Sequence, residues 1–166
     1  SDLLLARRIQ KQILPRDINS ISEKLRFDVI YQPMAEVGGD IYNVSRTRDG
    51  KIRVFLADAT GHGVQAAFVT MLIKAEYERL KNYASSPDEL LELLNHEFFH
   101  EYRSLVVFFT CILIDIDVPN HQIICASAGH PEQFLLINDE LTLIPSTGKL
   151  AGAVKDSLYW NIEFDF

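Results

Sequence analysis

Residues 36–63 have the sequence EVGGDIYNVSRTRDGKIRVFLADATGHG. Two apolar stretches within it lie on either side of Asp49-Gly50, a pair that favours a tight β-hairpin turn. With the turn centred near Asp49, residue 40 comes to lie opposite residue 58. The hairpin would therefore bring Asp40 and Asp58 together, with Cβ atoms about 4.5–5.5 Å apart.

This acid pair predicts a site for a divalent cation. Two carboxylates at that distance repel each other, and Mg²⁺ or Mn²⁺ would remove the repulsion because both ions prefer oxygen ligands. Gly38 and Gly39 precede Asp40 and allow close approach of the backbone. After Asp58 the chain begins a helix, whose N-terminus can bind an anion such as phosphate. The alternative is that both acids are ordinary turn or cap residues.

The rest of the chain alternates between helical and strand patterns. Apolar residues recur at helical spacing over residues 2–14, 63–83 and 86–105. Strand patterns cover residues 27–32, 41–45, 52–57, 106–116, 121–128, 133–137 and 141–144. Because most strands are grouped apart from the helices, we expect an α+β fold with mainly antiparallel sheet.

Composition excludes several classes of function. The 166 residues suit a single domain, and a net charge of −7 argues against nucleic-acid binding and against a polybasic membrane surface. The longest apolar run, residues 105–114, is far shorter than the roughly 20 residues of a membrane helix. Cys111 and Cys125 lie in apolar runs and are expected to be buried free thiols. With no signal peptide visible, we expect a cytoplasmic protein.

Four segments together resemble a known family. They are ILP at 13–15, YQPMAEVGGDIY at 31–42, ADATGHGVQAA at 57–67 and SAGHP at 127–131. In this order they resemble the bacterial PP2C-type (PPM) serine/threonine phosphatases of the SpoIIE/RsbU family. The resemblance implies an αββα sandwich of antiparallel sheets flanked by helices. It also implies an N-terminal linker or switch helix over residues 1–15 and a phosphatase domain over residues 16–166.

The same resemblance assigns roles to site residues. Members use two Mn²⁺ or Mg²⁺ ions to activate a water that attacks the phosphorus. Asp40 matches the first family aspartate, Asp58 the aspartate that bridges both ions, and Ala59 the residue whose backbone carbonyl binds one of them. Both aspartates would thus be catalytic residues as well as metal ligands.

Four further residues are expected near these ligands rather than on the ions. Glu36 matches a recurrent family glutamate, for which we expect a contact through water. Gly39 precedes Asp40 and His62 follows Asp58, and both are expected near the ions as supporting residues. For His62, protonation of the leaving oxygen competes with a packing or capping role at the helix start. His130 follows Gly129 in a turn, where a structural role in the loop competes with a role in the site.

The implied substrate is a regulatory protein phosphorylated on serine or threonine, of the type found in partner-switching control of sigma factors. An upstream sensor domain and a homodimer through the N-terminal helix are further expectations. One alternative is an inactive pseudo-phosphatase that works as a protein-binding module. A nucleotide cyclase of the Gly-Gly-Asp-Glu-Phe type is disfavoured because Ile41-Tyr42 follows Asp40.

The sequence also departs from the family pattern. Members carry later metal-binding aspartates in a Thr-Asp-Gly motif and an Asp-Asp pair, and neither Asp156 nor Asp165 lies in such a context. Asn43 stands where an aspartate is common. We therefore expect a domain that is incomplete at its C-terminal end, lacking the last strands and ligands, with the metals absent or partly bound.

Overall fold

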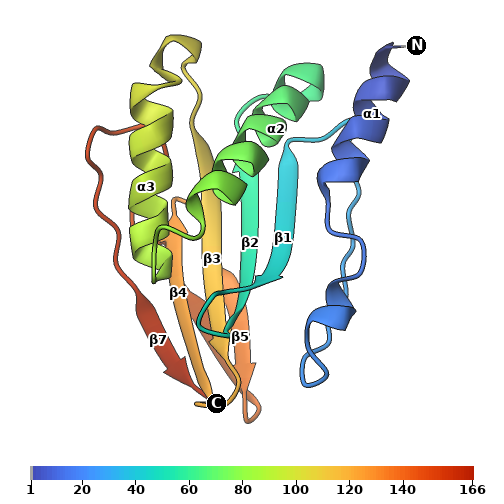
Figure 1. Cartoon of the computed structure of the whole chain (residues 1–166). Helices are drawn as coiled ribbons and strands as arrows, with labels where there is room; N and C mark the ends of the chain where they lie inside the picture. Colours follow the sequence, from blue (N-terminus) through green and yellow to red (C-terminus); the bar gives the residue numbers. More distant parts are fainter. Residues whose placement is uncertain (1) are drawn as a thin grey trace.

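A five-stranded antiparallel sheet forms the centre of the computed structural model, which describes residues 2–166 (Figure 1). Its strand order is β1-β2-β3-β4-β7, and a separate antiparallel pair joins β5 to β6. The strands are β1 (Asp40–Arg46), β2 (Ile52–Ala59), β3 (Phe109–Asp117), β4 (Gln122–Ala128), β5 (Gln133–Ile137), β6 (Glu140–Ile144) and β7 (Ile162–Asp165). The helices are α1 (Asp2–Ile13), α2 (Gly63–Leu80) and α3 (Pro87–His100), with short 3₁₀ helices η1 (Ile18–Ile21) and η2 (Arg103–Leu105).

Helices α2 and α3 cover one face of the large sheet (Figure 1). Alternate residues of β2 point to this face, and Phe55 stacks on Tyr77 of α2 with ring centroids 4.2 Å apart. Phe98 of α3 packs edge-on against Phe109 of β3 at 4.8 Å. All four aromatic side chains are fully buried, so this interface is the main hydrophobic core.

The opposite face of the sheet packs on the β5–β6 pair. Ile112 and Cys125 from the large sheet form a buried cluster with Ile144 of β6. The result is a layered arrangement of helices, large sheet and small sheet, which agrees with the expected α+β class and antiparallel pairing. Cys111 and Cys125 are both free and buried, as predicted.

The main differences from the sequence prediction concern an absent strand, the end of one helix and an additional strand. Residues 27–32 pair with no strand among the described residues, and Ile30 is 89% exposed, so an alternating pattern without a partner leaves an extended segment. Helix α3 ends at His100, and η2 follows it before Val106 adopts a left-handed conformation. Strand β7 was not predicted, because its four residues contain only two that are strongly apolar.

No helix within residues 2–166 is both long enough and apolar enough to cross a membrane.

Candidate active site

Asp40 and Asp58 lie directly opposite each other where β1 begins and β2 ends. The register of this hairpin is the predicted one, and opposed residues share a face of the sheet. Since Phe55 points toward the helices, Asp58, three residues further along the strand, points to the other face. Both acids are exposed, so the pair is open to solvent.

The environment of the pair favours an added positive charge. Partial burial raises the pKa of Asp40, and the negative charge of Asp58 raises it further, while His130 acts in the opposite direction. Within residues 2–166, no lysine or arginine forms an ion pair with either acid. The two carboxylates therefore gain from a proton or a cation placed between them.

The backbone beside the pair brings a third oxygen close. The Ala59 N–H donates a hydrogen bond of 2.8 Å to the Gly39 carbonyl. A Cβ on Gly39 would lie 3.1 Å from the Ala59 carbonyl oxygen and 3.6 Å from Asp58 Oδ1. Glycine thus leaves a space that both oxygens border. Two carboxylates and a carbonyl form an all-oxygen donor set, which fits Mg²⁺ or Mn²⁺.

A pocket of about 520 Å³ opens at the acid pair. Gly39, Asp40, Asp58 and His62 all line it, and residues 32–35, 37 and 38 form much of its wall. His62 is the N-cap residue of α2 and is exposed, without a side-chain hydrogen bond to the helix end. The structure therefore brings four of the predicted residues together around one opening.

The register also extends the site to Thr110, which the sequence analysis missed. Thr110 lies opposite Asp58 across β2 and β3, and its hydroxyl is 2.9 Å from His130 Nδ1. Burial lowers the pKa of the His130 ring, whereas the charge of Asp40 raises it. His130 is therefore a neighbour of the acid pair as well as a loop residue. The place of Thr110 depends on how β3 aligns with β2, which no local sequence pattern specifies.

Helix α1 holds the loop that leads into β1. The buried Gln10 side chain accepts a 2.9 Å hydrogen bond from the Gly38 N–H and donates one of 2.6 Å to the Gly38 carbonyl. Gln10 also donates to Thr70 of α2 at 3.1 Å. Glu36 accepts from Arg7 at 2.6 Å, so its carboxylate is directed to α1 rather than to the pocket. Sequence analysis did not identify this role, because Gln10 is one of several polar residues on the helix.

Comparison with known proteins identifies relatives of this chain. The model of the family "Stage II sporulation protein E (SpoIIE)" matches residues 48–166. The chain is 28% identical over 133 residues to phosphoserine phosphatase RsbP of Bacillus subtilis, covering 78% of this chain and 32% of that protein. It is 25% identical over 161 residues to phosphoserine phosphatase RsbU of the same species, covering 96% and 47%. The chain thus spans about a third to a half of the length of these relatives.

Solved structures share the fold. The SiaA-PP2C domain of Pseudomonas aeruginosa superposes with a TM-score of 0.86 at 24% identity, covering 99% of this chain and 66% of that one. The PP2C phosphatase domain of SpoIIE from Bacillus subtilis gives 0.63 at 14% identity, covering 78% and 38%. At these identities the likeness concerns the fold, which is the PP2C-like arrangement of antiparallel sheets and helices.

Proposed function

Because the chain belongs to the SpoIIE family, we propose that it is the metal-dependent phosphatase domain of a protein that removes phosphate from serine or threonine side chains. The pairing of Asp40 with Asp58 at the mouth of a pocket carries this proposal. The names of its relatives RsbP and RsbU, both phosphoserine phosphatases, support the substrate class.

Asp40, Asp58 and the Ala59 carbonyl are the proposed ligands for Mn²⁺ or Mg²⁺, with two ions in a complete site. Such ions acidify a bound water and neutralise the oxygens of a phosphoryl group. Gly39 keeps the space between the carbonyl and the Asp58 carboxylate free of side-chain atoms.

The surrounding residues orient the acids and the phosphate. Thr110 lies opposite Asp58 across the strands, and its hydroxyl is 2.9 Å from His130 Nδ1. We infer that His130, whose charge also acts on Asp40, is a positioning residue for the pair. The first turn of α2, which begins at Gly63 beside His62, offers free N–H groups to an anion in the pocket. Glu36 acts at a distance, by tying the loop to Arg7 of α1.

We propose that residues 1–15, of which residue 1 lies outside the described part of the chain, are a linker or switch helix, and that residues 16–166 are the phosphatase domain. Helix α1 reaches the acid pair through Gln10 and Gly38, so a change in its position would move the backbone just before Asp40. Leu4, Leu5 and Ile9 of α1 are between 43% and 58% exposed, and we propose that they pair with a second copy or with a sensor domain.

The substrate we propose is a phosphorylated regulatory protein of partner-switching type in control of a sigma factor, which would place the chain in the cytoplasm. An inactive binding module is the weaker alternative, since the acid pair, the glycine beside it and the carbonyl are all present.

The test is phosphate release from a phosphoserine protein and from a small aryl phosphate, with and without Mn²⁺. It uses this chain and the full gene product, each as wild type and as Asp58→Ala. Asp28→Ala is the matched control, because Asp28 is an exposed acid whose side chain is 78% accessible and which lies outside the pocket. We expect Mn²⁺-dependent release in the full product, lost in Asp58→Ala and kept in Asp28→Ala. Full activity of Asp58→Ala would refute the site, and an inactive wild-type product would favour the binding module.

A further inference from the structure

A cluster of two histidines and one aspartate lies on the outer surface of α3. His96 and His100 are one helical turn apart, with ring centroids separated by 4.3 Å. Asp156, from the segment between β6 and β7, places its Oδ1 4.0 Å from His100 Nε2. One ligand atom from each of the three residues lies within 4.8 Å of the other two, and all three side chains are exposed.

The segment that carries Asp156 is fixed to α3 on both sides of it. The buried Asn95 side chain donates 3.0 Å to the Val154 carbonyl. Further along, the Asn161 side chain donates 2.7 Å to the Asp88 carboxylate and accepts 3.1 Å from the Asp88 N–H. Between these attachments Asp156 adopts a left-handed conformation, with φ of 50°. These attachments place the exposed Asp156 carboxylate beside the histidine pair.

Two imidazoles and a carboxylate are a donor set for Zn²⁺, unlike the all-oxygen set at the acid pair. Around tetrahedral Zn²⁺, with bonds of about 2.0–2.2 Å, ligand atoms lie roughly 3.3 Å apart. The three atoms here need to move by about 1 Å or a little more to reach that spacing, which side-chain rotation of exposed residues supplies. Glu89 and Glu92 line the adjoining groove with His96 and Asp156, and they add negative potential.

From this geometry we propose that His96, His100 and Asp156 form a Zn²⁺ site, with a water molecule in the fourth position. The site belongs to the helical layer, whereas Asp40 and Asp58 point to the other face of the large sheet. A bound ion would join α3 to the segment between β6 and β7. Zinc would therefore stabilise the fold without taking part in phosphate chemistry, and the proposal does not depend on the phosphatase assignment.

The test is calorimetric titration of the protein with Zn²⁺ alone, carried out in wild type and in Asp58→Ala, which removes one acid of the pair. We expect one zinc-binding event to remain in Asp58→Ala. His96→Ala and His100→Ala should weaken it at least about tenfold, and Asp156→Asn should weaken it as well. Zn²⁺ at about 100 times its Kd should raise the Tm by about 5–10 °C.

Two substitutions serve as matched controls. His121→Asn removes a histidine outside the cluster, and Asp139→Asn removes an exposed acid that, like Asp156, has a positive φ. Both should leave the zinc event unchanged. In wild-type protein, Zn²⁺ should also shift the imidazole NMR signals of His96 and His100 but not that of His121, a readout that needs no variant to fold.

The proposal is overturned if all zinc binding disappears in Asp58→Ala. It is equally overturned if the cluster variants bind Zn²⁺ as tightly as the wild type, or if the His96 and His100 signals stay fixed.

Discussion

The carboxylates at the two ends of the central sheet differ in whether a basic side chain pairs with them. At one end, Asp40 and Asp58 face each other without a basic partner among the described residues. At the other end, Asp115 lies opposite Arg53 across β2 and β3. The guanidinium donates from Nε and from Nη2 to the two carboxylate oxygens, each at 2.6 Å, and both side chains are almost fully buried.

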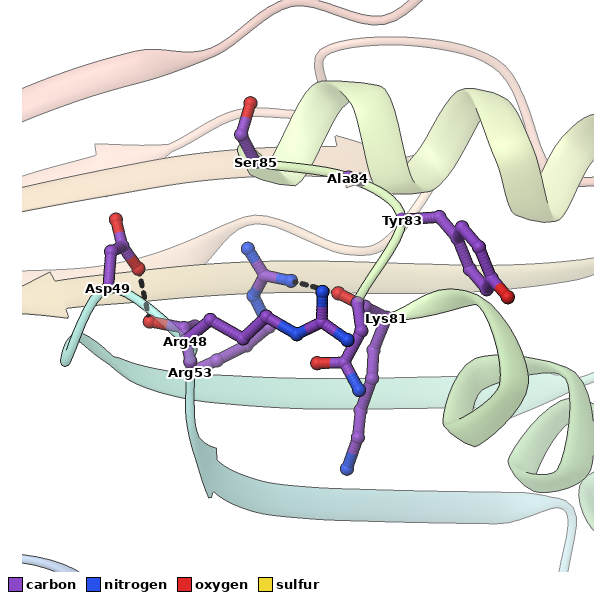
Figure 2. Close-up of a pocket in the computed structure, with 9 residues that line it drawn as sticks. Arg48, Asp49, Arg53, Lys81, Tyr83, Ala84 and Ser85 are labelled. Atoms are coloured by element: carbon purple, nitrogen blue, oxygen red, sulfur yellow. Dashed lines mark hydrogen bonds between the residues drawn. The ribbon is translucent and has the colours of Figure 1, made fainter.

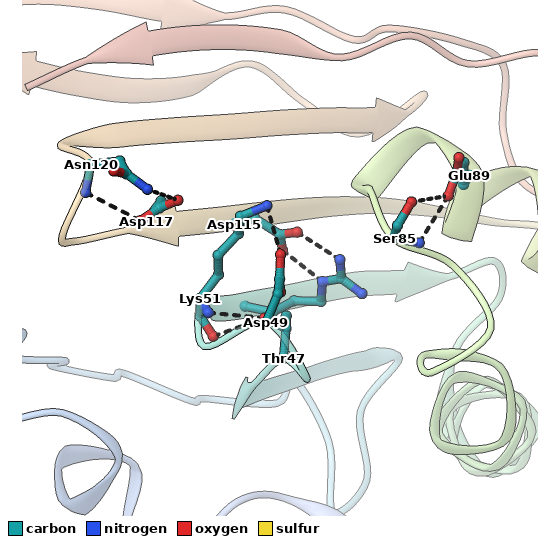
Figure 3. A network of polar contacts seen from close by, with 9 residues as sticks. Thr47, Asp49, Lys51, Ser85, Glu89, Asp115, Asp117 and Asn120 are labelled. Carbon is teal, nitrogen blue, oxygen red and sulfur yellow. Dashed lines mark hydrogen bonds and ion pairs between the residues drawn. The ribbon is translucent and has the colours of Figure 1, made fainter.

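We call the end with Asp40 and Asp58 the open end and the end with Arg53 and Asp115 the closed end. At the closed end the charged side chains form a network among themselves. Figure 3 shows Asp115 beside the hairpin turn, where Lys51 pairs with Asp49 at 3.0 Å. Figure 2 shows the adjoining pocket of about 280 Å³, in which Arg53 also points to the Lys81 carbonyl. Burial lowers the pKa of the Arg53 guanidinium, but the bonds and charge of Asp115 more than offset this and raise it. Here the chain supplies its own counter-charge.

The contrast separates a carboxylate that is paired inside the fold from the two carboxylates that we propose as cation ligands. A buried acid requires a bonded partner, since an unpaired buried charge is strongly destabilising. An exposed pair of acids tolerates its repulsion because solvent screens it, and can therefore be kept for binding. Substitutions at the two ends should then separate activity from stability.

The largest expected effect is on activity, at the open end. Asp58→Asn removes one proposed ligand and should lower kcat/KM for the full gene product by about 10³-fold or more, because metal ions contribute several kcal/mol to phosphoryl transfer. The free energy of unfolding should not fall. Rate measurement over a Mn²⁺ series and urea denaturation check both parts. A variant that keeps its rate but unfolds more easily would reverse the comparison.

At the closed end we expect the opposite result, a loss of stability without a loss of activity. Asp115→Ala leaves the buried Arg53 without a carboxylate partner and should lower the free energy of unfolding by about 3–5 kcal/mol. Activity per folded molecule should stay within about twofold. The control is the double variant Arg53→Met with Asp115→Leu, which removes both charges and should recover most of the stability. If the single and double variants are equally destabilised, packing rather than charge explains the loss.

The sequence allowed the pairing of the charged residues to be predicted at the open end but not at the closed end. The Asp-Gly turn defined the register of Asp40 and Asp58 from local spacing alone, and the structure has that register. The pairing of Arg53 with Asp115 depends on how β3 aligns with β2, across 62 residues that include two helices. No local pattern specifies that alignment, so both this ion pair and the place of Thr110 were missed.

The same limit explains the errors in the fold. The helices and the strands of the hairpin follow from periodicity, which is a local property. Whether residues 27–32 become a strand depends on a partner, and none lies beside them in the described part of the chain. Conversely, β7 becomes a strand because β4 offers it an edge, with Ile123 opposite Phe164. Gln10 gained its role in the same way, from the distant carbonyl and N–H of Gly38.

A smaller effect is expected at Gln10, because the open end depends on a loop held from α1. Gln10→Leu leaves the Gly38 N–H and carbonyl without their partner and should cost about 1–3 kcal/mol of stability. Mn²⁺ affinity should weaken as well, since Gly38 is two residues from Asp40. Gln12→Leu, on the exposed side of the same helix, is the matched control. Equal Mn²⁺ affinity in both variants would show that α1 does not act on the site.

The smallest effect concerns the repulsion between the Asp40 and Asp58 carboxylates. Removal of one of them should raise the stability of the metal-free protein, whereas removal of the Asp115 carboxylate should lower it. The pKa of Asp40 is raised in the folded protein, by burial first and by Asp58 next. A raised carboxyl pKa gives stability that is present below the ordinary value near 4 and is lost as the pH rises through the folded value. Without metal, Asp40→Asn should therefore have the same free energy of unfolding as the wild type near pH 3.5. At pH 7 the free energy of unfolding of Asp40→Asn should exceed that of the wild type by up to about 1 kcal/mol, a figure limited by solvent screening.

Mn²⁺ should reverse this order at pH 7, because the wild type gains ligand-binding energy that Asp40→Asn lacks. Urea denaturation in EDTA and in Mn²⁺ at both pH values measures the four differences, with Asp28→Asn as the control for removal of an exposed acid. Were Asp40→Asn less stable than the wild type in EDTA at pH 7, Asp40 would resemble Asp115, a carboxylate that the fold needs. The carboxylates at the two ends of the sheet would then differ in exposure, but both would stabilise the fold.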